Sequence, residues 1–270
     1  MHVQALAPHD VAPALLIAGQ RPYAHCYLTA LLEQGKLADL AGVFDGQDLV
    51  AVASVAGNCV STDLQPLSAL ALADFLARTG RHVASIVCRA PDVALLWDAL
   101  AGRWGSPRDV RTAQPLLVLS QAPRVPIDHL VRRSRADEVD VVLPCCVEMF
   151  TGEVGVSPIA GGLAPAYRRR IEQTIATGKS FIRRDERGLV FKAEIGSVSS
   201  AACQVQGVWV RPDRRGEGIS APAMAAVAVE AMRSIAPAVE LYVNDFNTVA
   251  RKTYERVGFE QVDTFRTVFF

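Results

Sequence analysis

One stretch of the chain, GVWVRPDRRGEGIS at residues 207–220, has the pattern of a strand that passes through a glycine-containing loop into a helix. Gly216 and Gly218 carry no side chain, so backbone N–H groups in this loop can approach an anion closely. The helix expected from Ala221 adds the partial positive charge of its N-terminus. The stretch therefore predicts a site for a phosphate or pyrophosphate group.

Two other phosphate-binding patterns compete with this interpretation. A P-loop is excluded because no Lys-Ser/Thr pair follows the glycines. The run GEGISA at residues 216–221 formally satisfies the dinucleotide fingerprint, and Asp245 follows at a plausible distance. That fingerprint opens a large parallel sheet, however, and only 50 residues follow Ser220. A nicotinamide enzyme is therefore the weaker interpretation.

The second half of the chain alternates between strand-like and helix-like segments around the loop. An alanine-rich run with Pro222 in its first turn predicts a helix that Pro237 ends, and Asn247 and Gly258 are favourable caps for a second helix. Helical character also marks 144–150 and 167–176. After Gly178 we expect strands at 180–184, 189–195 and 201–210, a helix at 221–235, a strand at 239–243, a helix at about 247–257 and a strand at 261–270.

The first half repeats this rhythm more faintly, although no residue-level identity links the halves. Strands are expected at 40–44, 49–55, 83–88 and 116–119, and helices at 67–78 and 91–104. An internal pseudo-repeat explains this order economically. The segment 120–126, with two prolines, is the better domain boundary, so we expect domains at 1–125 and 126–270.

A second motif, NTVARKTYERVGF at residues 247–259, lies downstream of the loop, and its Asn247, Ala250, Tyr254 and Val257 share one helix face. It resembles the N-x-x-A-x-x-x-Y-x-x-x-G-F signature of the GNAT superfamily. Residues 215–220 resemble the superfamily's motif A, with Ser220 in place of the usual Gly or Ala. Because both motifs occur at the right distance, the GNAT resemblance is preferred over the dinucleotide fold.

The resemblance covers about residues 135–270, and extends to an actinobacterial family that fuses an N-terminal domain of unknown function to a GNAT domain. The segments MFTGEVGVSP at 149–158 and LYVNDFN at 241–247 are shared with that family. It implies an α+β protein of tandem GNAT-like domains, each a mixed, mostly antiparallel sheet flanked by helices. The N-terminal domain has no glycine-rich loop, so it is expected to be a degenerate copy that has lost acetyl-CoA.

The resemblance also implies which residues bind the cosubstrate, acetyl-CoA, without a metal. Backbone groups of the strand at 208–210 would contact the pantetheine arm, and amides at 215–220 would contact the pyrophosphate. The implied cofactor-binding residues are Val208, Trp209, Val210, Arg215, Gly216, Glu217, Gly218, Ile219, Ser220, Asn247 and Ala250.

The catalytic residues are expected to be one tyrosine and one of two carboxylates. The resemblance places Tyr254 near the thioester, where its phenol would protonate the departing thiolate. None of the five histidines lies in 136–270, so a carboxylate must accept the proton of the attacking amine. Glu153, expected in the loop between the first two helices, and Glu194, on a central strand, are the candidates. Many family members carry an acid on the strand before motif A, where this chain has Gln204 and Gln206.

Composition limits the classes of partner and location. The 28 basic side chains balance the 28 acidic ones, so no long-range positive field would draw the chain onto nucleic acid. The six cysteines are scattered, with no CxxC pair and no histidine at ligand spacing, which argues against zinc and favours reduced thiols. No secretory leader and no apolar run of about 18 residues is found, so a cytoplasmic protein without a membrane partner is expected.

The sequence thus predicts an N-acetyltransferase whose acceptor is an amine on a small molecule or a peptide. A homodimer is left open. The alternative is a non-catalytic acyl-CoA-binding or regulatory module, in which motif A survives but the acceptor site is closed. Retention of Tyr254 and Asn247 favours the enzyme.

Overall fold

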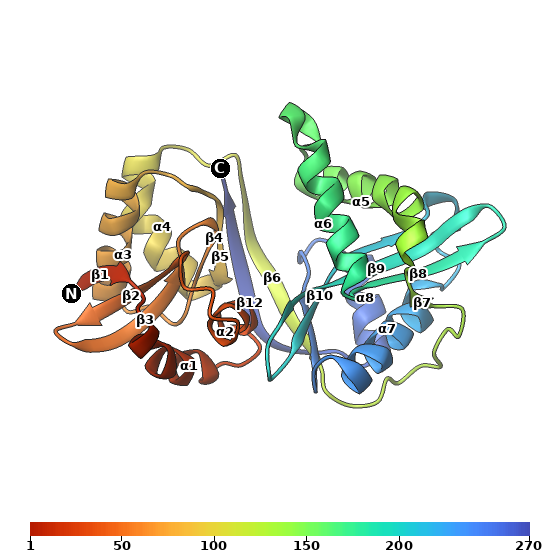
Figure 1. Cartoon of the computed structure of the whole chain (residues 1–270), viewed down its shortest axis with the longest axis horizontal. Helices are drawn as coiled ribbons and strands as arrows, with labels where there is room; N and C mark the ends of the chain where they lie inside the picture. The colour runs from red at the N-terminus through yellow and green to blue at the C-terminus, as the bar shows by residue number, and fades with distance from the viewer.

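The computed structural model describes all residues, 1–270, as two halves that meet in the middle of one twelve-stranded sheet (Figure 1). The first half comprises β1 (His2–Ala5), α1 (Val11–Gly19), α2 (Cys26–Glu33), β2 (Leu40–Asp45), β3 (Asp48–Ser54), β4 (Gly57–Ser61), α3 (Pro66–Thr79), β5 (Val83–Arg89), α4 (Ala90–Trp104) and β6 (Asp109–Leu119). The second comprises β7 (Arg132–Arg133), α5 (Val139–Val154), α6 (Ala164–Ala176), β8 (Ser180–Asp185), β9 (Gly188–Val198), β10 (Cys203–Val210), α7 (Ser220–Ser234), β11 (Val239–Tyr242), α8 (Thr248–Val257) and β12 (Glu260–Phe269). Both halves have the same order of elements, which confirms the pseudo-repeat.

The sheet is mixed and mostly antiparallel, as expected. Its strand order is β1-β2-β3-β4-β5-β12-β6-β11-β10-β9-β8-β7. Only β4 with β5 and β10 with β11 run parallel, and these two pairs occupy equivalent positions in the two halves. In each half a helix, α3 or α7, connects the two parallel strands, as a parallel crossover requires.

The two halves share their last strands. β12, from the end of the chain, pairs with β5 through residues 265–269, and β6 pairs with β11 through residues 116–119. β6 and β12 also pair with each other along most of their length. Figure 1 shows this crossed pair between the two halves. Each half is therefore closed by a strand that the other half supplies.

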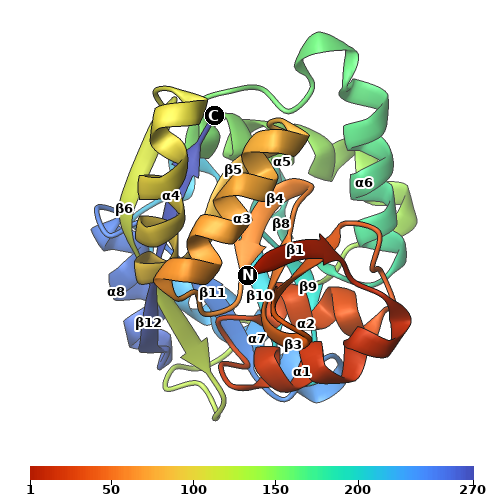
Figure 2. The ribbon, with the colours of Figure 1, turned by 90° about the vertical axis from the view of Figure 1, so that its left-hand side faces the viewer.

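The hydrophobic core of each half also includes residues from the strand that the other half supplies. The core of the first half includes Phe265 and Val268 from β12, and the core of the second includes Leu117 and Leu119 from β6. Helix α2 adds a further contact between the halves, since the Glu33 carboxylate accepts a hydrogen bond from the Ser200 backbone N–H at 3.0 Å. Figure 2 shows α3 and α4 on one side of the first half and α1 and α2 on the other.

In the second half, helices cover both faces of the sheet. α5 and α6 pack on the face that carries Ile182 and Trp209, whereas the alanine-rich α7 packs on the opposite face with Val190 and Phe191. α7 begins at Ser220, so Pro222 lies in its first turn, where a missing N–H costs little. The helix then starts directly at the end of the glycine-containing loop, as the sequence predicts.

The second-half elements were predicted well, and the first half was predicted less completely. The Asn247 side chain accepts a hydrogen bond from the Ala250 N–H, and Gly258 ends α8 in the left-handed region, which confirms both caps. No prediction covered β1, α1, α2 or β4, and β6 is longer than the predicted 116–119.

Three further observations concern the chain as a whole. All six cysteines are free thiols, and all but Cys145 are buried. No group of three or more His, Cys, Asp or Glu side chains is arranged to hold a metal ion. None of the helices combines the length and the apolar character that a membrane crossing requires.

Candidate active site

The loop between β10 and α7 presents a row of backbone N–H groups that have no partner. None of the amides of residues 216–221 donates a hydrogen bond within the protein. Gly216 and Gly218 have φ values of +83° and +77°, and no atom lies within 4 Å of where a Cβ would be at either position. Because these groups open α7, they add to the positive end of its dipole. The loop is therefore built to hold an anion such as a pyrophosphate.

Arginines fix the shape of this loop. Arg211 and Arg214 both contact the Asp185 carboxylate, at 2.8 and 2.7 Å. The hydrogen bonds from Arg211 hold the pKa of Asp185 at about 2, so the contact persists over the whole neutral range. Arg215 donates from Nε to the Val210 carbonyl at 3.0 Å, which ties the loop to the end of β10.

Next to the loop, the parallel strands β10 and β11 separate. Their backbones pair only at Cys203 with Val239 and at Gln204 with Glu240. β10 then becomes irregular between Gln206 and Trp209 and continues to residue 210. The edge of β10 that faces β11 is consequently unpaired over residues 208–210. This edge offers backbone groups to an extended ligand that enters from the loop.

The predicted cofactor residues lie along these two features. Val208, Trp209 and Val210 form the unpaired edge, although the Trp209 side chain itself is buried in the core under α5. Arg215, Gly216, Glu217, Gly218, Ile219 and Ser220 form the loop and the first residue of α7. Asn247 and Ala250 begin α8, and α8 packs beside α7.

Tyr254 lies on α8, and only 7% of its surface is exposed. Its ring makes an edge-to-face contact with Phe259 at 5.8 Å between centroids. Burial raises the pKa of the phenol, and the negative charge of Glu153 raises it further. The hydroxyl is therefore protonated at neutral pH, as a general acid must be.

Glu153 differs from its predicted position, because it lies in the last turn of α5 and not in a loop. The helix continues past Gly152 and ends only where Gly155 adopts the left-handed region, with φ +78°. Glu153 is accessible to solvent, yet desolvation by the surrounding protein raises its pKa, against the opposing charges of Arg111 and Lys192. A carboxylate that solvent can reach and whose pKa is raised is suited to accept a proton.

Glu194 has a different environment, although it also lies on the α5 side of the sheet. It is buried on β9, forms an ion pair with Lys192 Nζ at 2.8 Å, and accepts a hydrogen bond from Cys146 Sγ at 3.1 Å. Burial alone would raise its pKa, but the adjacent Lys192 ammonium outweighs burial and lowers it. The solvent access and raised pKa of Glu153 suit a proton acceptor better than the buried, ion-paired environment of Glu194.

The equivalent loop of the first half, between β4 and α3, is occupied by the protein's own side chains. The Leu64 N–H donates to Asp92 Oδ1 at 2.8 Å, and the Gln65 N–H donates to Ser68 Oγ at 2.8 Å. No glycine lies in residues 62–65. Two amides of this loop are thus used within the protein, and the loop has no glycine that would let an anion approach its backbone closely.

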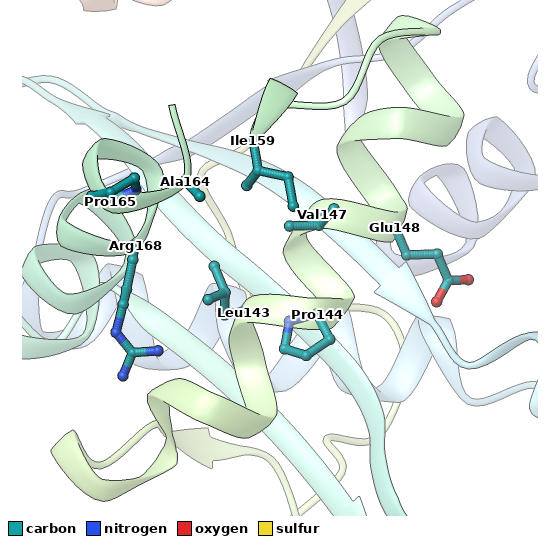
Figure 3. Close-up of a pocket in the computed structure, with 8 residues that line it drawn as sticks. All are labelled: Leu143, Pro144, Val147, Glu148, Ile159, Ala164, Pro165 and Arg168. Carbon is teal, nitrogen blue, oxygen red and sulfur yellow. The ribbon is translucent and has the colours of Figure 1, made fainter. Parts of the chain in front are cut away.

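A groove of about 730 Å³ lies elsewhere, between α5 and the start of α6. Figure 3 shows its mainly apolar lining, with Leu143 and Val147 from α5 opposite Ala164 and Pro165. None of the predicted site residues lines it. The groove is therefore distinct from the candidate site at the separated strands.

Sequence reasoning missed three residues near Glu153, which are Lys192, Arg111 and Tyr242. Lys192 and Arg111 both lie within electrostatic reach of Glu153, as do the rings of Tyr242 and Tyr254. Arg111 belongs to β6 of the first half, so only the strand exchange brings it here. The one signal in the sequence for any of the three was that Tyr242 lies in the segment 241–247, which is shared with the actinobacterial family.

Comparison with known proteins matches two parts of the chain to family models. Residues 38–142 match the model for a domain of unknown function, DUF4081, and residues 164–259 match the acetyltransferase (GNAT) family. None of the curated proteins compared with the chain matches it.

Solved structures with the same fold include a Drosophila protein (TM-score 0.70, 13% identity, 99% of this chain and 98% of that one). A GCN5-related N-acetyltransferase from Sphaerobacter thermophilus (0.64, 16%, 98% and 93%) and a tandem GNAT protein from the clavulanic acid biosynthesis pathway (0.59, 14%, 99% and 98%) also match. At these identities the likeness concerns the fold alone. The chain therefore joins an N-terminal DUF4081 domain to a C-terminal domain of the GNAT acetyltransferase family.

Proposed function

We propose that the C-terminal half transfers an acetyl group from acetyl-CoA to an amine by direct attack in a ternary complex. Membership of the GNAT family supports acyl transfer in general. The observation that carries the proposal is the row of unbonded amides at residues 216–221, which opens onto the separated strands β10 and β11. These amides suit the pyrophosphate of CoA, and the unpaired edge of β10 suits its pantetheine arm.

The chain's own residues supply the acid and the base. Glu153 accepts a proton from the ammonium form of the acceptor, directly or through one water, so that the free amine can attack the thioester carbon. Backbone N–H groups at residues 208–210 stabilise the negative charge that develops on the thioester oxygen. Tyr254 then protonates the CoA sulfur as the carbon–sulfur bond breaks. As the amide forms, its nitrogen loses a second proton, which restores the Tyr254 phenol through solvent, and Glu153 releases its proton to water. The net products are the N-acetyl amide, CoA with a free thiol, and one proton.

The acceptor in this proposal is an amine on a small molecule or a peptide. A panel of both classes, incubated with acetyl-CoA and the full chain, should contain acceptors that release CoA above background and whose mass increases by one acetyl group in place of one hydrogen. Binding of acetyl-CoA without CoA release for any acceptor, and without slow thioester hydrolysis, would instead identify a non-catalytic acyl-CoA-binding module.

A further inference from the structure

The C-terminal end of α5 rests on two arginines from the other half of the chain. Arg111 Nη2 donates to the carbonyl oxygen of Glu153, and Arg108 Nη1 donates to the carbonyl oxygen of Val154 at 2.8 Å. The last carbonyls of a helix have no partner within the helix. Guanidinium donors satisfy them and complement the negative end of the helix dipole. β6 thus fixes the turn that carries Glu153.

The strand exchange holds both arginines in place. The guanidinium carbons of Arg111 and Arg108 lie 5.1 and 5.4 Å from the centroid of the Phe269 ring on β12. Only 10% of the Arg111 side chain is exposed, and its Nε lies 3.4 Å from Asp109 Oδ2. A planar guanidinium that lies over an aromatic ring keeps its donors in a fixed direction.

Charged and titratable groups from four elements lie close enough to the Glu153 carboxylate to interact with it electrostatically. They are Arg111 on β6, Lys192 on β9, Tyr242 on β11 and Tyr254 on α8. The two cations favour the ionised carboxylate, while burial opposes it. Arg111 is the cation that also contacts the backbone of Glu153.

We propose that Arg111, supplied by the DUF4081 half, is a positioning residue that orients the Glu153 carboxylate in the acceptor site of the GNAT half. This inference rests on the proposed role of Glu153 as the base. It gives the first half a part in the reaction even though its own loop has no glycine and uses its Leu64 and Gln65 amides within the protein. Arg111 acts through Glu153 and need not touch either substrate.

The test compares Arg111→Met with the wild-type full chain, using the best acceptor from the amine panel. Methionine keeps an apolar stem on Phe269 but removes the donors and the charge. Turnover should fall roughly tenfold, a fraction of what a positioned base contributes, while acetyl-CoA affinity stays the same. Because a lost cation raises the pKa of Glu153, the acidic limb of the kcat/KM profile should move to higher pH.

Arg108→Met is the matched control, because Arg108 contacts the same helix end and the same ring but does not affect the pKa of Glu153. Its acidic limb should stay in place. Arg111→Lys keeps the charge with fewer donors and should return the limb toward the wild-type position. If Arg111→Met does not fold, Arg111→Lys provides the comparison with the wild type.

Glu153→Gln separates this inference from the proposed function. If Glu153→Gln is as active as the wild type, the assignment of the base fails, and the role of Arg111 fails with it. If Glu153→Gln is inactive while Arg111→Met keeps both the turnover and the acidic limb, only the positioning role is wrong. A limb that moves equally in the Arg108 and Arg111 variants would also overturn it, since loosening of the helix end would then suffice.

Discussion

Arg89 on β5 and Asp263 on β12 form an ion pair of 2.6 Å that joins the exchanged strand to the first half of the chain. The Arg89 guanidinium also contacts Asp63 at 2.7 Å. Both members of the Arg89–Asp263 pair are mostly buried, with 16% and 18% of their side chains exposed. Such a pair contributes more than an exposed one because water screens it less.

The Asp263→Asn variant should therefore lose about 1.5–3 kcal/mol of unfolding free energy, the range for hydrogen bonds to charged groups. Asparagine keeps the size of the side chain but removes the charge that faces Arg89. Urea unfolding gives the measurement. Glu260→Gln is the control on the same strand, since Glu260 and Arg124 are 70% and 62% exposed, and it should cost less than about 1 kcal/mol. Equal losses in both variants would contradict the prediction.

Gly218→Val should weaken the binding of acetyl-CoA by roughly tenfold or more, about 1.4 kcal/mol per factor of ten. A Cβ at this position stands in the open space before the free amides, where the pyrophosphate is proposed to lie. Calorimetry on the wild type should give one site per chain, because the loop of the first half is filled by Asp92 and Ser68.

Valine is also strained at the positive φ of Gly218, so the control must share that strain. Gly46 has φ +60° in the turn between β2 and β3, with no atom within 4 Å of the position that a Cβ would take, and lies in the other half. Gly46→Val should lose stability to a similar degree but bind acetyl-CoA normally. A folded Gly218→Val protein with unchanged affinity, or a stoichiometry near two, would show that the loop is misplaced.

The sequence predicted those parts of the fold that local chemistry determines. Asn247 caps α8 and Gly258 ends it because a side-chain acceptor and a left-handed glycine satisfy backbone groups within a few residues. The loop at 211–219 was found for the same reason, since two glycines between a strand and a helix restrict the structures that the chain can adopt.

The strand exchange could not be predicted, because it depends on tertiary pairing. β6 and β12 both follow a helix, and either could have closed its own half. The predicted position of Glu153 was wrong for a local reason, since Gly152 is typical of a helix break although α5 continues to Val154. Arg111 was missed because nothing near it in sequence links it to α5. The candidate acid and the glycine-containing loop were thus open to sequence reasoning, whereas the surroundings of the candidate base were not.

Glu240 makes the stability of the fold dependent on pH. It is buried on β11 with 1% exposure, and Oε1 accepts a hydrogen bond from Gln204 at 2.9 Å, while Oε2 has no partner. Burial raises its pKa from the ordinary value of 4.5 to about 8. Between these two values the folded chain binds more protons than the unfolded chain, so the contribution of this group to stability decreases as the pH rises.

Glu240→Gln cannot ionise and keeps an acceptor for Gln204. Relative to the wild type, this variant should gain on the order of 1 kcal/mol or more of unfolding free energy between about pH 5 and pH 8, where each unit of pKa shift corresponds to about 1.4 kcal/mol. Urea unfolding at a series of pH values gives the difference. Glu186→Gln, at an exposed turn, should follow the wild type. Parallel curves for Glu240→Gln and the wild type would show that this carboxyl is solvated.

Tyr254→Phe tests the proposed acid. Phenylalanine keeps the ring and its contact with Phe259 but removes the hydroxyl, so the fold and the affinity for acetyl-CoA should be preserved. If the hydroxyl protonates the CoA sulfur, turnover should fall roughly 10²-fold, the lower end of what a positioned acid contributes. The loss should appear in kcat and kcat/KM together, because the interaction forms only in the transition state.

The CoA thiol is a fairly good leaving group, so the drop depends on how far water can replace the phenol. Burial and Glu153 both raise the pKa of Tyr254, so the wild-type enzyme should show no alkaline loss of activity from ionisation of this phenol below about pH 10.

Tyr242→Phe serves as a comparison, since that ring also lies near Glu153 but has no assigned proton transfer. Wild-type turnover in Tyr254→Phe, measured where chemistry limits the rate, would leave Tyr254 a packing residue.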